Sequence, residues 1–275
     1  MSAFESDPKF EFIEADIRDY NSIIELTHGF DIISHQAALG SVPRSIENPM
    51  LSTDVNVSGS VNILHAAVVN KVQRVILACS SSTYGDSTSL PKKEDVIGKP
   101  LSPYAITKYA MELYADVFQK TYGLDFIGLR YFNVFGPKQS SDNPYAAVIP
   151  IFCKAFLEGR SPKINGDGET SRDFTYVDNA VQANLKAIFT DNESALNQIY
   201  NVACGERTSL NEMMTALRKI TQQDIEASYG PERPGDVKHS LADISKIQNL
   251  LDYTPAIKFE EGLEKVYQWY TSQNG

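Results

Sequence analysis

Two short segments carry the residue types that could perform proton-transfer chemistry. The first is a serine-rich run at residues 80–85, with the sequence S-S-S-T-Y-G, and the second is S-P-Y-A-I-T-K at residues 102–108. In the second segment Tyr104 and Lys108 stand four residues apart, which on a helix places both side chains on one face. An ammonium group near a phenol favours the phenolate, so the pair could serve as a general base and acid.

The size of the pKa change shows what else this chemistry needs. A free tyrosine loses its proton near pH 10, and bringing that pKa to neutrality takes about three units, or ~4 kcal/mol of differential stabilisation. One exposed lysine cannot supply this, whereas a desolvated lysine together with a positively charged nicotinamide ring can. Tyr–Lys pairs at this spacing also occur on ordinary surface helices. The serine run, the motif and their strand–helix context together favour a cofactor-dependent active site.

The elements that must position these residues follow from the apolar pattern. Short apolar runs bounded by polar turns predict strands at 10–15, 31–35, 74–79 and 126–131. Apolar residues at three- and four-residue spacing predict helices at 53–70 and 103–122, the second ending at Gly123. This alternation predicts an α/β fold with a doubly wound, Rossmann-like parallel sheet.

After Asn133 the composition changes, and Gly, Pro, Ser and Asn crowd residues 136–144 and 159–168. We expect a nucleotide-binding domain at 1–135 with a returning segment at about 172–203, and a smaller mixed α/β substrate domain at 136–171 and 204–275. A helix at 260–270 should pack on the smaller domain. Ligands in such folds lie at the carboxyl ends of the strands, here in the crevice between the two parts.

Composition excludes several classes of partner. The net charge is -10 and no run of Lys and Arg is present, which argues against nucleic acid and anionic membranes. No stretch approaches the ~20 apolar residues needed to span a bilayer. Cys79, Cys153 and Cys204 are far apart and form no C-x-x-C pair, so neither a disulfide framework nor a metal site is indicated, and a reducing cytoplasm is expected.

A dinucleotide-binding fold normally opens with a strand, a glycine-rich turn and a helix whose N-terminus binds the pyrophosphate. No such segment is found in this sequence, because the glycine cluster at 165–168 comes late and lacks the strand–turn–helix context. We therefore expect an N-terminally truncated nucleotide-binding domain with a weakened grip on the pyrophosphate.

The motifs resemble those of the extended short-chain dehydrogenase/reductase family, and within it the bacterial UDP-N-acetylglucosamine 4-epimerases. The resemblance covers essentially the whole chain and is carried by the serine run and by H-Q-A-A-L-G-S-V-P-R-S at 35–45, L-R-Y-F-N at 129–133 and G-E-T-S-R-D-F at 168–174. It implies NAD as cofactor, a UDP-sugar substrate, a homodimer and a role in supplying surface-polysaccharide precursors.

The resemblance also implies roles for individual residues. Tyr104 would be the catalytic acid and base, Lys108 would contact the cofactor ribose and lower the pKa of the tyrosine, and Ser80 would hydrogen-bond the reacting hydroxyl. Further cofactor contacts would come from Asp16 and Ile17 at the adenine, from Gln36, Ala37 and Ala38 where the cofactor approaches the backbone, and from Asn56 on the nicotinamide side.

The substrate residues implied by the resemblance lie mostly in the second half of the chain. Arg172 and Arg233 would clamp the diphosphate, a task suited to a planar fork of donors. The remaining substrate contacts would be Ser81, Ser82, Asn133, Asp236 near the uridine ribose, and Ser240 facing the C2 substituent of the sugar.

Related enzymes use the same Tyr–Lys chemistry for other reactions. The 4,6-dehydratases and the UDP-glucuronate decarboxylases of this family carry an acidic residue between the catalytic Ser/Thr and the later Tyr-Gly. Residues 81–83 contain no carboxylate, which disfavours dehydration. The expected reaction is 4-epimerisation of a UDP-N-acetylhexosamine or its uronate through a 4-keto intermediate. The alternatives are a UDP-glucose 4-epimerase, a nucleotide-sugar dehydratase or decarboxylase, and a catalytically silent sugar-nucleotide-binding protein.

Overall fold

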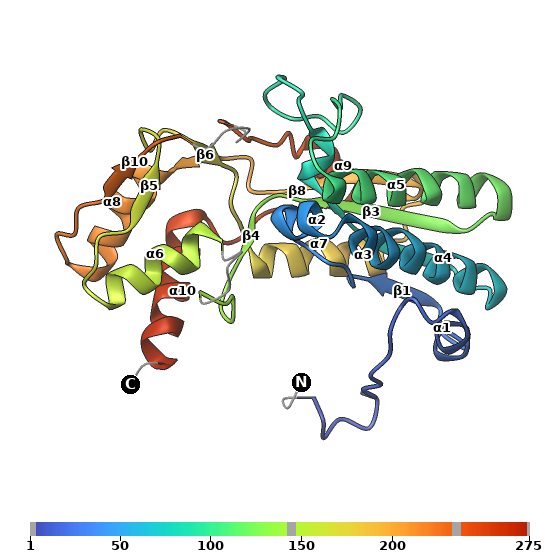
Figure 1. The fold of residues 1–275 in the computed structure, drawn as a ribbon. Coiled ribbons are helices and arrows are strands. Elements are labelled where there is room, and N and C mark those ends of the chain that lie inside the picture. The colour runs from blue at the N-terminus through green and yellow to red at the C-terminus, as the bar shows by residue number, and fades with distance from the viewer. Residues whose placement is uncertain (1–3, 142–146, 233–237, 274–275) are drawn as a thin grey trace.

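The chain folds into a larger part built on a parallel sheet and a smaller part made of short strands and helices (Figure 1). The structure is a computed structural model and describes residues 4–141, 147–232 and 238–273. In Figure 1 the sheet and its helices lie on the right, and the smaller part lies on the left.

The central sheet has four parallel strands in the order β1 (Ile32–His35), β2 (Arg74–Ser80), β3 (Asp125–Tyr131) and β8 (Gln198–Val202). Because the two central strands, β2 and β3, are buried on both faces, they are rich in apolar residues along most of their length rather than at alternate positions. All four run in the same direction, so their carboxyl ends meet at one edge of the sheet.

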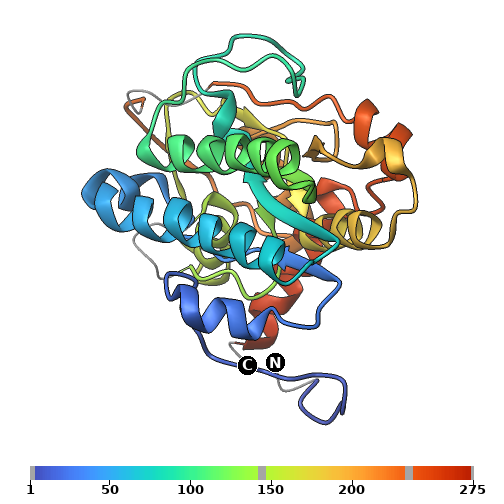
Figure 2. The same ribbon diagram turned by 90° about the vertical axis from the view of Figure 1, so that its right-hand side faces the viewer.

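Alternate side chains of the strands build two separate cores. Val75 and Leu77 pack with α4 (Gly59–Val69) and α5 (Pro103–Tyr122) on one face. Ile76 on the other face packs with α7 (Val177–Phe189) and α9 (Ser245–Leu251). Figure 2 shows α5, in green, beside α4, in cyan and blue, across the first face. A doubly wound parallel sheet is thus confirmed.

The smaller part has its own apolar core. Helices α6 (Val148–Leu157), α8 (Leu210–Thr221) and α10 (Phe259–Gln273) surround it, and β5 (Lys163–Asn165) pairs with β10 (Ser228–Gly230) beside them. Leu263, Val266 and Tyr270 of α10 are buried there, which confirms the predicted C-terminal helix and its packing face.

Two-residue strands connect the two parts. β4 (Val134–Phe135) pairs with β7 (Thr175–Tyr176), and β6 (Ser171–Arg172) pairs with β9 (Thr208–Ser209). The remaining described elements are short: α1 (Tyr20–Leu26), α2 (Val42–Glu47), α3 (Pro49–Thr53), a π-turn η1 (Asp54–Ser58), and the 3₁₀ turns η2 (Ser81–Tyr84) and η3 (Glu193–Ala195).

Three predicted strands and all three predicted helices are confirmed, and one expectation is wrong. Residues 10–15 form no strand, and Phe12 and Ile13 are exposed. None of the described strands pairs with this segment, so its backbone groups have no ladder partner. The helix expected at 53–70 is confirmed, because α3, η1 and α4 follow one another without a break and the π-turn η1 lies within the helix. The helix at 103–122 is confirmed as α5, with Gly123 as its left-handed C-cap at φ +72°.

A buried ion pair locks α5 onto the sheet. The Arg130 guanidinium of β3 donates to both carboxylate oxygens of Glu112, from Nε at 2.9 Å and from Nη2 at 2.7 Å, and both residues are about 95% buried. Nη1 also donates to the Glu94 carbonyl at 2.9 Å, and the guanidinium lies 4.9 Å from the centre of the Tyr84 ring. The pair therefore joins α5 to β3 and to the turn that contains the serine run.

Replacing Arg130 by methionine should destabilise the protein strongly, because it leaves the Glu112 carboxylate buried without a partner. We expect the free energy of unfolding to fall by about 3–5 kcal/mol in urea titrations. The double variant Arg130→Met with Glu112→Leu removes both charges and should recover most of this loss. A loss below about 1 kcal/mol in the single variant would contradict the structural role assigned to the pair.

Candidate active site

Tyr104 and Lys108 lie on the first two turns of α5. The Ser102 hydroxyl caps the helix by accepting the Ala105 N–H at 3.1 Å, and proline occupies the first helical position, where it is well tolerated. The Tyr104 N–H donates to the Ser45 hydroxyl of α2 at 3.0 Å, which anchors this turn to its neighbour. The helix start is therefore fixed from both sides.

The Lys108 ammonium is buried against the sheet. Its Nζ donates to the Ala78 carbonyl of β2 at 2.6 Å, and this is its one partner among the described residues. Burial lowers the pKa of Lys108. An ammonium has three N–H donors, so two remain for hydroxyl groups of a ligand.

The serine run begins where β2 ends. The Ser80 hydroxyl accepts hydrogen bonds from the Ser82 N–H at 3.2 Å and the Ser82 hydroxyl at 2.9 Å, and η2 begins with Ser81. The run closes at Gly85, where φ is +52° and a Cβ would lie 1.8 Å from the Lys99 carbonyl oxygen. Only glycine fits this turn, which fixes the direction in which the serines leave the strand.

Burial raises the pKa of Tyr104, and the contact with the Ser80 hydroxyl opposes this shift. The Lys108 charge is not among the interactions that move it. Without a ligand, therefore, the phenol holds its proton at neutral pH. The lysine alone therefore does not ionise this phenol at neutral pH, as the residues themselves had indicated.

Asn56 has all of its hydrogen bonds inside the protein. It lies in the π-turn η1, where its Oδ1 accepts the Leu39 N–H at 2.7 Å. Its Nδ2 donates to the Leu39 carbonyl at 3.2 Å and to the Thr107 hydroxyl at 3.1 Å. Asn56 thus ties the segment after β1 to α5, a role that the sequence pattern does not indicate.

A hollow of about 440 Å³ lies beside Gln36, at the carboxyl ends of β1 and β3. The Gln36 side chain donates to Asn184 Oδ1 at 3.1 Å and accepts from the Tyr131 hydroxyl at 3.2 Å. Asn184 Nδ2 completes the ring by donating to the Tyr131 hydroxyl at 2.7 Å. Sequence reasoning missed Tyr131 and Asn184, whose polar tips become neighbours only when α7 covers the sheet.

The residues at this edge fit the nicotinamide end of NAD. Lys108 offers two buried donors for ribose hydroxyls, and the small side chains of Ala37 and Ala38 directly follow Gln36, which lines the hollow. Within residues 4–141, 147–232 and 238–273, no glycine-rich turn opens a helix beside it. The described residues therefore fit the nicotinamide end of the cofactor.

The two residues predicted to contact adenine lie before α1. Asp16 is exposed and forms an ion pair with Arg18 at 2.5 Å, whose hydrogen bonds lower the pKa of Asp16 to about 2. Arg18 also reaches Asp54 at 3.3 Å. Ile17 packs against Gly59 of α4, where a Cβ would lie 2.6 Å from its Cδ1. The side chains are therefore held against α3, η1 and α4.

Three of the predicted substrate residues lie around β6, whereas Ser81 and Ser82 lie in η2. Asn133 Nδ2 donates to the Asp173 carbonyl at 3.1 Å, and the Ser240 N–H donates to the Ser171 carbonyl at 3.1 Å. Arg172 Nη1 donates to the same Ser171 carbonyl at 3.0 Å. The structure thus brings Asn133, Arg172 and Ser240 together.

Two predicted substrate residues lie outside the described residues, and the structure says nothing of them: Arg233 and Asp236.

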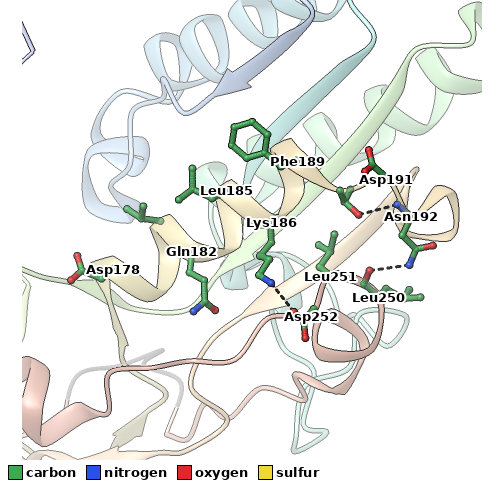
Figure 3. Close-up of a pocket in the computed structure, with 12 residues that line it drawn as sticks. Asp178, Gln182, Leu185, Lys186, Phe189, Asp191, Asn192, Leu250, Leu251 and Asp252 are labelled. Atoms are coloured by element: carbon green, nitrogen blue, oxygen red, sulfur yellow. Dashed lines mark hydrogen bonds and ion pairs between the residues drawn. The ribbon is translucent and has the colours of Figure 1, made fainter. Parts of the chain in front are cut away.

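A second hollow, of about 750 Å³, lies between α7 and α9 (Figure 3). An ion pair between Lys186 and Asp252 at 2.7 Å crosses it, and Phe189 projects from α7 with three quarters of its surface exposed. None of the predicted site residues lines this hollow, so it is separate from the Tyr104 site.

Two further searches cover the described residues. No group of three or more His, Cys, Asp or Glu side chains is placed to hold a metal ion. No described helix is both long enough and apolar enough to cross a membrane.

Known proteins provide an independent comparison. Residues 2–203 match the NAD dependent epimerase/dehydratase family. A putative UDP-glucose 4-epimerase of Methanocaldococcus jannaschii is 36% identical over 269 residues, which are 97% of this chain and 86% of the relative.

Solved structures match over nearly the whole chain. A UDP-N-acetylglucosamine 4-epimerase from Methanobrevibacter ruminantium, in complex with UDP-N-acetylmuramic acid, is 41% identical with a TM-score of 0.90, covering 95% of this chain and 83% of that one. A UDP-glucuronic acid 4-epimerase from Bacillus cereus, with UDP-glucuronic acid and NAD, is 29% identical with a TM-score of 0.90, covering 99% and 85%. With the Tyr–Lys helix, the serine run and the parallel sheet in place, the chain belongs to the NAD-dependent epimerase/dehydratase family.

Proposed function

We propose that this protein is an NAD-dependent UDP-sugar 4-epimerase whose substrate is a UDP-N-acetylhexosamine, interconverting UDP-GlcNAc and UDP-GalNAc or the corresponding uronates. The observation that carries the proposal is the placement of Ser80, Tyr104 and the buried Lys108 around the carboxyl end of β2. The similarity to 4-epimerases that bind several different UDP-sugars supports the reaction type.

The chain's own residues supply the proton transfers. Bound NAD would supply the acceptor and donor of the hydride at C4 of the sugar. Tyr104, as phenolate, removes the proton from O4 while Ser80 holds this oxygen by a hydrogen bond, so that C4 becomes a ketone. After the keto sugar has turned, Tyr104 gives the proton back to O4 and C4 is inverted. Lys108 would hold the cofactor ribose and add the positive charge that the phenol needs to ionise.

The surroundings of the serine run support epimerisation rather than dehydration. Ser81, Ser82 and Thr83 stand between Ser80 and Tyr84, so no carboxylate is available there for a further proton transfer. Ser81 and Ser82 are half-buried and border the Ser80 hydroxyl, as substrate contacts would. The three buried free cysteines fit the cytoplasm, where we place the synthesis of this polysaccharide precursor.

The proposed homodimer is supported by an apolar face on α5 and its neighbours. Ile106, Leu113 and Val117 each expose half or more of their surface on one side of α5, and Ile46 and Met50 do so on α2 and α3. These helices contact one another over one face of the sheet (Figure 2). A contiguous exposed apolar surface of this kind is typical of a protein–protein interface.

Tyr104→Phe should lower kcat for UDP-GlcNAc epimerisation by at least a hundredfold, since it removes the group that accepts and returns the O4 proton. Binding of UDP, measured by calorimetry, should stay within about twofold of the wild type. Tyr122→Phe, at the exposed end of α5, is the matched control and should keep full activity. Undiminished turnover in Tyr104→Phe would exclude the acid/base role.

Ser240→Tyr should discriminate between substrates by the size of their C2 substituent. A tyrosine ring would fill the space that an acetamido group needs, so kcat/KM for UDP-GlcNAc should fall by roughly ten- to a hundredfold, while UDP-glucose remains a substrate. Ser240→Ala keeps the space open and serves as the control. Equal losses on both sugars, or no loss on either, would show that Ser240 does not face C2.

The combined substitutions Leu113→Lys and Val117→Lys should convert the dimer into a monomer in sedimentation-velocity experiments, because they place two charges in the apolar face of α5. Phe189→Lys changes an even more exposed apolar residue on α7, across the sheet, and should leave the dimer intact. A dimer that survives the α5 substitutions, or is lost with Phe189→Lys, would place the interface elsewhere.

A further inference from the structure

A strap of chain, residues 238–242, carries Ser240 along the edge of β6. The Ser171 N–H donates to the Lys238 carbonyl at 2.9 Å, and the Ser240 N–H donates to the Ser171 carbonyl at 3.1 Å. On its other side the strap accepts a hydrogen bond from the Lys92 N–H at 2.7 Å. The strap therefore runs between β6 and the loop after the serine run, and its register decides what Ser240 faces.

The last hydrogen bond between the strap and the chain at β6 is accepted by a side chain. A regular parallel ladder would continue with a bond from the Ala242 N–H to the Asp173 carbonyl. That carbonyl instead accepts from Asn133 Nδ2 at 3.1 Å. The Ala242 N–H donates to Asp173 Oδ2 at 3.2 Å, so the carboxyl group takes the place of the backbone acceptor.

The same carboxyl group also holds the turn after β8. The Cys204 N–H donates to Oδ1 at 3.0 Å, and the Gly205 N–H donates to Oδ2 at 3.1 Å. Asp173 is fully buried, and among the described residues no Lys or Arg forms an ion pair with it. The carboxyl group of Asp173 therefore accepts three backbone N–H groups from two segments. A turn held only by local contacts would not need such a group.

We propose that Asp173 is a positioning residue of the sugar-nucleotide site, which fastens the strap to β6 and to the turn after β8 and so sets where Ser240 stands. The proposal rests on the proposed function to the extent that the strap borders a sugar nucleotide. The three hydrogen bonds that carry it do not depend on the ligand.

Because the carboxyl group of Asp173 anchors the strap, the closure of the strap depends on pH. Burial raises the pKa of Asp173 to about 7, from an ordinary value of 3.8. Opening of the strap would hydrate the carboxyl group and return its pKa to the ordinary range. Between about pH 4 and 7 the closed strap therefore binds a proton that the open strap has lost. Closure is strongest at the acid end of this window, weakens as the pH rises through it, and levels off above about pH 8.

Other charged and titratable groups adjoin the carboxyl group. Glu206, on the turn after β8, raises the pKa of Asp173 and is itself paired with Lys258 at 2.6 Å. The remaining neighbours are Arg172 on the same strand, Lys238, His239 and Asp243 on or next to the strap, Lys92 on the facing loop, Cys204 on the turn, and Tyr253 after α9.

Hydrogen exchange of the strap amides measures the closure directly and needs no ligand. After correction for the intrinsic exchange rate, the protection of residues 238–242 in the wild type should fall by up to tenfold per pH unit between about pH 5 and 7, and level off above about pH 8. In Asp173→Asn the titrating group is gone, so protection should not change with pH over this window. His239→Gln should keep the wild-type profile, which assigns the slope to Asp173 rather than to the strap's histidine.

A second variant keeps the test decisive if Asp173→Asn folds poorly. Glu206→Gln lies on the exposed turn, touches no residue of the proposed site, and removes a charge that raises the pKa of Asp173. In Glu206→Gln, the pH above which the protection of residues 238–242 stops falling should therefore be lower than in the wild type. A flat wild-type profile, or identical profiles for Glu206→Gln and the wild type, would overturn the proposal.

Calorimetric titration with UDP tests whether the anchor serves the nucleotide site. Asp173→Asn presents an amide N–H₂ to one of the three backbone donors, so the Kd for UDP should rise roughly tenfold. Asp243→Asn makes the same change next to the strap, where the carboxylate bonds Ser245, and should leave the Kd unchanged.

An unchanged Kd in Asp173→Asn overturns the positioning role while the proposed function stands. Failure of the wild type to bind UDP overturns the proposed function, and the exchange profile then decides the role of the anchor separately.

Discussion

The burial of the Lys108 ammonium beside the end of β2 is the constraint on which the rest of the site depends. An ammonium group loses its hydration there and regains one strong protein hydrogen bond, to the Ala78 carbonyl. Its position is acceptable only if α5 cannot move away from the sheet. The Arg130–Glu112 pair, one turn further along α5, provides that rigidity, and the cap at Ser102 fixes the helix start. Tyr104 is carried by the same rigid segment, so its phenol and the ammonium are placed by one set of contacts.

The substrate side is built on a different principle. Its connecting strands are two residues long, and the strap beside β6 is held by isolated backbone hydrogen bonds and by the side chain of Asp173. Such segments bury little apolar surface and open at lower free energy than the central sheet. A rigid catalytic helix therefore faces a strap that is held at a few points. This division suits an epimerase, because the keto sugar has to turn between the two hydride transfers while the tyrosine stays in place.

One expectation from the sequence was wrong, and another lacked a detail, for the same physical reason. Residues 10–15 have the apolar pattern of a strand, but a strand exists only when a neighbour supplies hydrogen-bond partners, and none of the described strands pairs with them. The helix expected at 53–70 is present, and the π-turn η1 within it holds Asn56 against Leu39 and Thr107. Both outcomes depend on partners distant in sequence.

The sequence by itself determined the parallel sheet and the start and end of α5, and it singled out Ser80, Tyr104 and Lys108 as candidates for the chemistry, because periodicity, caps and an i, i+4 spacing are local properties. The tertiary structure alone decided which polar groups meet. Gln36, Tyr131 and Asn184 come from three elements and form one hydrogen-bonded ring. The Asp173 carboxyl group accepts the Ala242 N–H, while the Asp173 carbonyl accepts from Asn133. The upward shift of the Tyr104 pKa likewise comes from burial by the surrounding fold, which no spacing along the chain encodes. Packing decides which groups lose their hydration and which distant groups form hydrogen bonds, so these features follow from the tertiary structure and not from local sequence.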